Sequence, residues 1–213
     1  MKLHIFAPSP NCRKILALIH YLDMDVEINN LNFVEGEHKE ADTMAINPNG
    51  AVPVLEDGDY KIWESNAILE YLADKHITEH GDNAIYPKDA KKRATIKQWL
   101  YWQTAHYGGA ISTIAWENFA KPVFGLGDAN PALVKDGLER FHKYAPVLEA
   151  ELEKHDFVAG DQMTIADFAM ANTAAVHEAG KVPVGDYPAI TAWYARMDKQ
   201  DAWAKAAPPP FTP

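Results

Sequence analysis

The sequence predicts two domains of different class: an α/β domain with a mixed sheet, then an all-α domain. Over the first eighty residues, short apolar segments alternate with amphipathic segments at helical spacing, which is typical of an α/β fold. Asp57-Gly58 is a tight-turn signal between two strand-like segments, so it adds an antiparallel hairpin to the sheet. Beyond residue 88 only helix-like patterns are evident.

The first domain is expected to run strand, helix, strand, loop, strand, strand and helix. Its strands are short and apolar or alternate between apolar and polar residues, and we expect them at 2–7, 26–31, 51–55 and 60–62. Its helices carry isoleucine and leucine at a spacing of 3.6 residues, and we expect them at 11–22 and 64–76. The polar segment 37–45 is either a short helix or an irregular loop.

The domain boundary is predicted near residue 80, where the composition becomes polar and includes Gly81 and Pro87. We therefore assign 1–78 to the first domain, 79–88 to a linker and 89–213 to the helical domain. The helical domain has four periodic segments, at 89–119, 130–154, 164–179 and 187–198. The proline-rich tail 208–213 is expected to be extended or frayed.

The charge and hydropathy of the chain exclude several classes of partner. It has 30 acidic and 20 basic side chains and a formal net charge of −10, which repels nucleic acid but allows an anionic small molecule in a locally positive pocket. No apolar run reaches the ~20 residues of a membrane span. The short apolar N-terminus is followed at once by Pro8 and Pro10, unlike a signal peptide, so a cytoplasmic protein is expected.

The segment Ser9-Pro10-Asn11-Cys12-Arg13 is the first candidate site, because it lies where the first strand gives way to the first helix. A helix N-terminus favours an anion such as a thiolate. The segment parallels the C-P-x-C redox motif with serine in place of the first cysteine, so a hydroxyl could donate a hydrogen bond to a ligand's sulfur. Two simpler interpretations stay open: Ser9 caps the helix, and Cys12, the single cysteine, packs as a small buried residue.

Two further segments of the first domain are candidates for ligand binding. Pro53 follows a turn and begins a strand, where proline is tolerated and where the Val52-Pro53 bond is either trans or cis. Glu64-Ser65 opens a helix, so Ser65 and neighbouring N–H groups could receive a carboxylate and Glu64 an ammonium group. Ordinary helix capping explains the second pair equally well.

Other motifs point away from metal and nucleotide chemistry. His76-Ile77-Thr78-Glu79-His80 matches H-x-x-E-H, but it lies where the helix is expected to end and no third ligand is identifiable, so no metal is predicted. Glycine fingerprints for phosphate and the G-x-S-x-G elbow are absent from the sequence. The segment 89–119 carries more aromatic residues than one small core can bury, which favours a subunit interface and a homodimer.

Four motifs together resemble the cytosolic glutathione transferase family, in particular its serine-using theta, delta and phi-like branches and their bacterial relatives. In chain order they are the Ser9 segment, the run from Asn47 through Val52-Pro53 to Leu55, Trp63-Glu64-Ser65-Asn66-Ala67-Ile68, and Phe157-Val158-Ala159-Gly160-Asp161 with Thr164-Ile165-Ala166-Asp167. The resemblance covers nearly the whole chain. It implies a thioredoxin-like first domain and an all-helical second domain.

The family resemblance also implies roles for individual residues. Glutathione would be the co-substrate, activated as a thiolate by Ser9 and held by His38, Val52, Pro53, Glu64 and Ser65. A small hydrophobic electrophile would lie against Trp102, His106, Tyr107 and Ile111, with Phe211 from the tail as a further candidate. Thr164 and Asp167 would form a structural capping box with no part in chemistry. The resemblance therefore implies an enzyme, a glutathione S-transferase that acts in detoxification.

The sequence departs from the family pattern at Gly50 and Ala51, where a basic or amide side chain often holds the glycyl carboxylate. That carboxylate must then rely on His38, Lys39 or a partner subunit. Two other functions stay open. One is a glutathione-dependent peroxidase or disulfide reductase that uses Cys12. The other is a non-enzymatic binding or scaffold protein, which the joint presence of these motifs disfavours.

Overall fold

The computed structural model describes residues 1–208, except the side chains of residues 174 and 175. The expected contribution of Phe211 lies outside the described residues. The chain divides into two compact units, which are Met1–Asp82 together with residues 200–208, and Asn83–Lys199. The first is an α/β unit and the second is helical, as the sequence predicts.

The α/β unit is built on a four-stranded mixed sheet with the strand order β2-β1-β3-β4. β1 (Lys2–Ile5) pairs in parallel with β2 (Glu27–Asn30) and antiparallel with β3 (Val54–Asp57). β3 pairs antiparallel with β4 (Tyr60–Trp63) across the predicted hairpin, where Gly58 adopts a positive φ of 60°. The predicted mixed sheet is confirmed, although β3 begins three residues later than expected.

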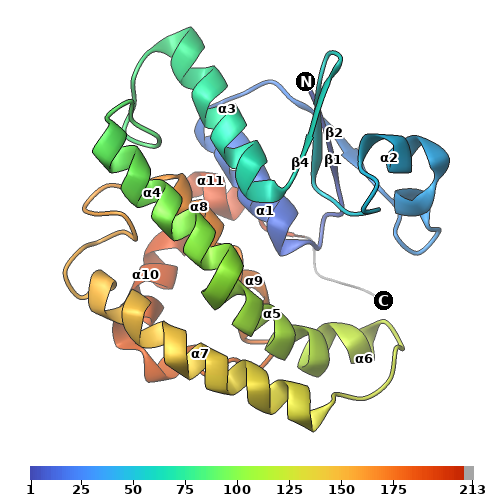
Figure 1. Ribbon diagram of the computed structural model, residues 1–213, viewed down its shortest axis with the longest axis vertical. Coiled ribbons are helices and arrows are strands. Elements are labelled where there is room, and N and C mark those ends of the chain that lie inside the picture. Colours follow the sequence, from blue (N-terminus) through green and yellow to red (C-terminus); the bar gives the residue numbers. More distant parts are fainter. Residues whose placement is uncertain (209–213) are drawn as a thin grey trace. The chain divides into compact units, whose positions relative to one another are not determined.

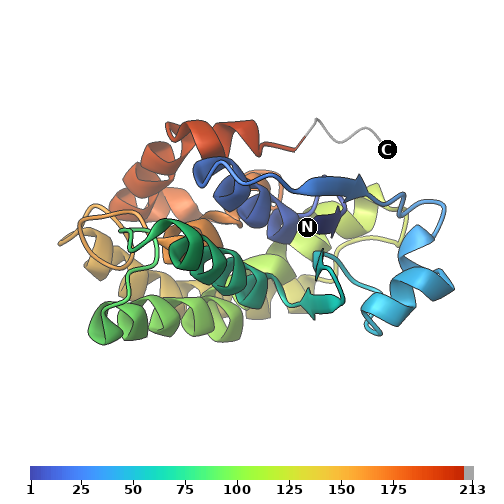
Figure 2. The ribbon, with the colours of Figure 1, turned by 90° about the horizontal axis from the view of Figure 1, so that it is seen from above.

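Two long helices cover one side of this sheet and a short helical segment lies on the other (Figures 1 and 2). α1 (Pro10–Tyr21) and α3 (Ser65–His80) bury their expected isoleucine and leucine residues against the strands. On the opposite side, the segment 37–45 forms η1 (Glu37–Lys39) and α2 (Ala41–Ile46). α3 runs four residues past its predicted end at 76 and stops before Gly81, whose φ is 93°.

A helix that the sequence analysis did not predict completes the α/β unit. α11 (Asp201–Lys205) packs on α1, although almost two hundred residues separate them. Its Trp203 is fully buried, and the Arg13 guanidinium of α1 lies 4.0 Å from the centre of the Trp203 ring. Arg13 also donates a hydrogen bond of 3.4 Å to the Trp203 carbonyl.

The helical unit begins with the segment expected as one long helix at 89–119. α4 (Ala90–Trp102), capped by the Asp89 carboxylate, continues through the π-helical turn η2 (Gln103–Tyr107) into α5 (Gly108–Ala115). A second π-helical turn, η3 (Trp116–Ala120), leads into α6 (Lys121–Val123). The segment is therefore continuous, but its side-chain register shifts twice relative to a plain α-helix.

The remaining helices of this unit pack on α4, on α5 and on one another. α7 (Pro131–Leu152) lies beside it so closely that a Cβ at Gly137 would come within 2.7 Å of Ile114 Cγ1. The segment expected as one helix at 164–179 is two helices, α8 (Ile165–Ala171) and α9 (Ala174–His177). η4 (Val184–Asp186) and α10 (Pro188–Asp198) follow (Figure 1).

Candidate functional site

The register of the sheet brings the candidate residues of the α/β unit to one edge. Val54 at the start of β3 pairs with His4 near the end of β1 and with Trp63 at the end of β4. The loop to Ser9 leaves β1 at this edge, Pro53 precedes Val54, and Glu64 follows Trp63. Three segments that are far apart in the sequence therefore converge where the strands meet the helix N-termini.

Ser9 occupies the N-cap position of α1, but its side chain makes no capping hydrogen bond. Its carbonyl accepts the first helical bonds instead, from Cys12 N at 3.0 Å and Arg13 N at 3.1 Å. The Ser9 side chain lies near the Cys12 thiol and lowers the pKa of that thiol slightly. Its half-buried hydroxyl is thus not committed to the helix backbone, and the capping interpretation does not account for its position.

Cys12 is fully buried in the first turn of α1. Burial raises the pKa of its thiol from 9.0 to about 11, and hydrogen bonds with Phe6 and Ser9 offset only part of that effect. A thiol with such a pKa stays protonated at neutral pH, so it is a poor nucleophile and is shielded from disulfide exchange.

The Val52-Pro53 peptide bond is cis. Of the two conformations that the sequence left open, the structure has the cis form. Val52 is half-exposed and Pro53 is buried. The preceding turn is held by Asn47, whose side-chain amide donates to the Ala51 carbonyl at 2.7 Å. Gly50 in this turn has a φ of 59°, a backbone conformation that favours glycine and explains the missing side chain there.

Glu64 is one of three non-glycine residues of the described chain with a positive φ, here 74° with ψ 110°. Its carboxylate is exposed and makes no capping hydrogen bond, and Ser65 begins α3 directly behind it. Backbone in such a sparsely populated region persists only where the surroundings enforce it, and it is concentrated at functional sites. Simple capping therefore does not account for Glu64.

Lys14 is a residue of this region that the sequence analysis missed. Its side chain is 1% exposed, and its Nζ donates a 2.6 Å hydrogen bond to Asn66 Oδ1 in the first turn of α3. Burial lowers the pKa of Lys14 from 10.5 to about 7, while Glu64 and Cys12 favour its charged form. The sequence feature that could have indicated its burial is its position one helical turn before Leu18, on the buried face of α1.

His38 lies in η1, and its ring stacks on Phe33 at a centroid distance of 4.0 Å. Phe33 in turn stacks on Phe6 at 4.5 Å, so the stack reaches the end of β1. The Nδ1 atom of His38 is buried and has no hydrogen-bond partner among the described residues. Lys39, the other basic residue proposed for the glycyl carboxylate, is exposed.

The four residues expected in an electrophile pocket differ in their exposure. Trp102 and His106 are partly exposed, and both rings pack against Tyr144. Tyr107 and Ile111 are fully buried in the core of the helical unit, where Tyr107 stacks on Trp102 at 5.6 Å. Of the four, only Trp102 and His106 present surface.

The helical unit contains the expected capping box at the start of α8. The Asp167 carboxylate is fully buried and accepts hydrogen bonds from Val158 N and Thr164 N, both at 2.8 Å. Trp193 Nε1 donates to it at 3.1 Å and the Thr164 hydroxyl at 3.2 Å. Asp167 thus connects three segments of the helical unit at one point.

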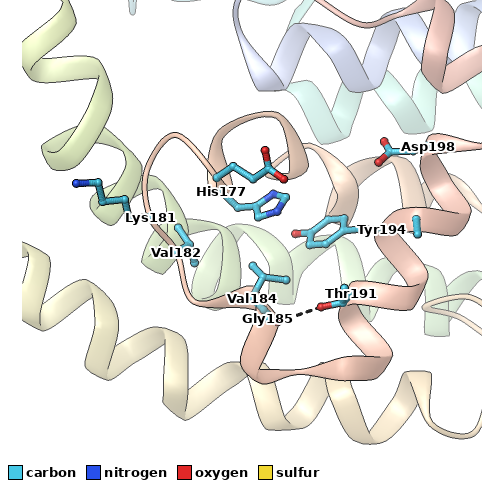
Figure 3. A pocket seen from close by; sticks show the side chains of 10 residues that line it. His177, Lys181, Val182, Val184, Gly185, Thr191, Tyr194 and Asp198 are labelled. Carbon is cyan, nitrogen blue, oxygen red and sulfur yellow. Dashed lines mark hydrogen bonds between the residues drawn. The ribbon is translucent and has the colours of Figure 1, made fainter.

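A separate cavity of about 430 Å³ opens in the helical unit (Figure 3). His177 and Tyr194 line it with parallel rings 5.2 Å apart, and Lys181 and Asp198 stand at its rim. It contains none of the residues that the sequence analysis selected. In the described part of the chain, no three His, Cys, Asp or Glu side chains group as metal ligands. No helix there is long and apolar enough to cross a bilayer.

The fold and the converging loops define a thioredoxin-like domain followed by an all-helical domain. Residues 1–74 match the family described as "Glutathione S-transferase, N-terminal domain", and residues 110–201 match "Glutathione S-transferase, C-terminal domain". The chain belongs to the glutathione S-transferase family, which confirms the resemblance drawn from its motifs.

Plant and fungal proteins are among its relatives. A glutathione S-transferase of Hyoscyamus muticus is 32% identical over 97% of each chain. The structure of glutathione transferase F7 from Populus trichocarpa is 27% identical, with a TM-score of 0.88 over 97% of each chain. Glutathione transferase URE2P6 from Phanerochaete chrysosporium, solved in complex with oxidized glutathione, is 28% identical, with a TM-score of 0.83 over 96% of this chain and 93% of its own.

Proposed function

We propose that the protein is a glutathione transferase that binds glutathione at the converging edge of its α/β unit and activates it as a thiolate. The observation that carries this proposal is the meeting of Ser9, Pro53 and Glu64 at one sheet edge, together with a Ser9 hydroxyl not used for capping. A scaffold protein has no need of this combination.

In the proposed complex, the Val52 backbone, next to the cis bond to Pro53, pairs with the cysteinyl unit of glutathione. The γ-glutamyl carboxylate lies at the N-terminus of α3, near Ser65, and its ammonium group faces Glu64. The unpartnered Nδ1 of His38 supports a role for this residue in holding the glycyl carboxylate. Each end of the tripeptide then meets groups of complementary charge or hydrogen-bonding capacity.

The chemistry depends on ionisation of the glutathione thiol. A cysteine thiol has a pKa of about 8.5, so little is ionised at neutral pH. A hydrogen bond donated by the Ser9 hydroxyl, together with the N-terminal end of α1, stabilises the thiolate and lowers that pKa. The thiolate then attacks the electrophilic carbon of a small hydrophobic substrate, and holding both reactants together supplies further acceleration.

The buried thiol of Cys12 argues against the alternative reductase. A disulfide reductase needs an accessible thiolate, whereas Cys12 is fully enclosed and its pKa is about 11. A peroxidase that uses only the glutathione thiolate would need the same site as the transferase. We propose transfer to carbon electrophiles as the main activity, in detoxification, by a cytoplasmic homodimer that needs no metal.

The test is turnover with glutathione and a panel of aryl halides, epoxides, aryl ethers, hydroperoxides and disulfides. The proposal expects turnover of at least one carbon electrophile, and loss of that turnover in Ser9→Ala. Turnover of disulfides alone would favour the reductase. Glutathione binding without turnover of any of these substrates would favour the scaffold.

A further inference from the structure

Lys14 has a position that core packing does not explain. A fully buried ammonium group loses its hydration, and in this α/β unit the surrounding core is apolar. Replacing a buried charge with an apolar side chain of similar volume is often neutral or stabilising. A lysine at this point of α1 therefore imposes a cost on folding, and another role would account for it.

The contacts of Lys14 lead to the γ-glutamyl end of the proposed glutathione site. Its Nζ donates to Asn66 Oδ1 at 2.6 Å, and Asn66 directly follows Ser65. The ammonium also attracts the carboxylate of Glu64, the residue before Ser65. Lys14 thus acts on both neighbours of Ser65 from inside the unit, while the outward side of this turn remains open to solvent.

The backbone of Glu64 requires this kind of support. A φ of 74° in a non-glycine residue is strained, and strain of this kind relaxes unless surrounding contacts prevent it. A charge-assisted hydrogen bond as short as 2.6 Å is among the stronger contacts that a side chain can make. It fixes the first turn of α3 relative to α1, the helix that carries Ser9.

We propose that Lys14 is a positioning residue of the glutathione site, which acts through Asn66 and Glu64 to hold the Glu64–Ser65 turn ready for the γ-glutamyl group. This inference rests on the proposed glutathione-binding function and adds to it a residue beneath the site. Lys14 does not contact the ligand, so its effect falls on glutathione affinity rather than on the chemical step.

The experiment measures glutathione binding by calorimetry near pH 6, together with steady-state kinetics and unfolding by urea. Lys14→Met keeps most of the side-chain volume and removes the charge, and Asn66→Leu removes the acceptor. Each variant is expected to bind glutathione about tenfold more weakly, with KM raised and kcat within about twofold. Lys14→Met should be at least as stable as the wild type. The double variant should bind no more weakly than the single variants.

Lys2→Met is the matched control, because Lys2 is a half-exposed lysine of the same unit that forms a surface ion pair with Glu27 at 3.1 Å. It should leave glutathione binding unchanged.

Glutathione binding by Lys14→Met within twofold of the wild type would overturn the inference while leaving the proposed function intact. Additive losses in the double variant, or a fall in kcat at unchanged KM, would also overturn it. Failure of the wild type to bind glutathione would overturn both proposals. Should Lys14→Met not fold, unchanged binding by Asn66→Leu would still contradict the inference.

Discussion

Ser9 and Cys12 lie one helical turn apart, yet we expect opposite consequences from removing them. Ser9→Ala removes a hydrogen bond to a charged sulfur, worth ~1.5–3 kcal/mol, which corresponds to roughly one to two pKa units on bound glutathione. Activity should fall at neutral pH and recover partly at high pH. Thermal stability should change little, because the Ser9 side chain makes no capping bond.

Cys12→Ala is the matched control for this prediction. It should leave transfer to carbon electrophiles nearly intact, because a buried thiol with a pKa of about 11 is a packing group. The measurement is the ultraviolet thiolate absorbance of bound glutathione, titrated with pH in both variants. A curve that shifts in Cys12→Ala and stays in place in Ser9→Ala would assign the chemistry to Cys12.

Asp167 is expected to affect stability and not glutathione binding. All four groups that hydrogen-bond to the Asp167 carboxylate are donors. An amide at this position would direct its own N–H groups against some of these donors. Asp167→Asn should therefore lower the free energy of unfolding by about 2–4 kcal/mol. The dissociation constant for glutathione should stay within about twofold, because Asp167 belongs to the helical unit.

The same substitution has a defined pH dependence. Burial raises the pKa of Asp167 from 3.8 to about 6, so the folded state binds this proton more tightly than the unfolded state does. The stability gained from that proton is fully present below the unfolded-state pKa and is lost as the pH rises through about 6. The stability difference between wild type and Asp167→Asn should therefore shrink between pH 4 and 7, as measured by urea unfolding at several pH values. A difference that grows with pH would contradict the assignment.

At the scale of elements, local rules account for what the sequence predicts correctly. Apolar periodicity locates α1 and α3, and Asp57-Gly58 locates the β3–β4 hairpin, because each depends on residues a few positions apart. The π-helical turns at 103–107 and 116–120 were not predictable in this way, because they have no sequence signature of their own. α11 was missed because it is short and depends on α1, almost two hundred residues away.

That dependence makes α11 testable as a structural part of the α/β unit. Trp203 is fully buried and stacks under Arg13, next to Cys12 and Lys14 on α1. Trp203→Ala should lower the free energy of unfolding by about 3–5 kcal/mol through the cavity that it leaves. Urea unfolding measures this, with Val34→Ala as the control, since Val34 is 90% exposed in the same unit. A loss no larger than that of the control would show that α11 does not stabilise the α/β unit.

At the scale of the whole molecule, the sequence predicts only in part how the segments of the candidate site come together. The motifs around Ser9, Pro53 and Glu64 are visible in the sequence, and strand pairing then brings them to one edge. The contribution of Lys14 was missed, because a lysine in an amphipathic helix is normally solvated, although its spacing from Leu18 already put it on the buried face of α1. The exposure of the predicted pocket residues likewise depends on packing, which encloses Tyr107 and Ile111 in the core of the helical unit.

Assembly of two chains is the last prediction, and the surface of the helical unit supports it. Tyr101 on α4 is 64% exposed and Trp116 on η3 is 46% exposed. Large exposed aromatic side chains favour an interface, and most soluble homo-oligomers are two-fold dimers. Light scattering at micromolar concentration should give a mass of about 47 kDa, twice the 23.7 kDa of one chain. Tyr101→Asp should shift the mass toward that of one chain, because the interface would bury an unpaired charge, whereas Val34→Asp, at an exposed position in the other unit, should not. A mass of one chain for the wild-type protein would refute the dimer.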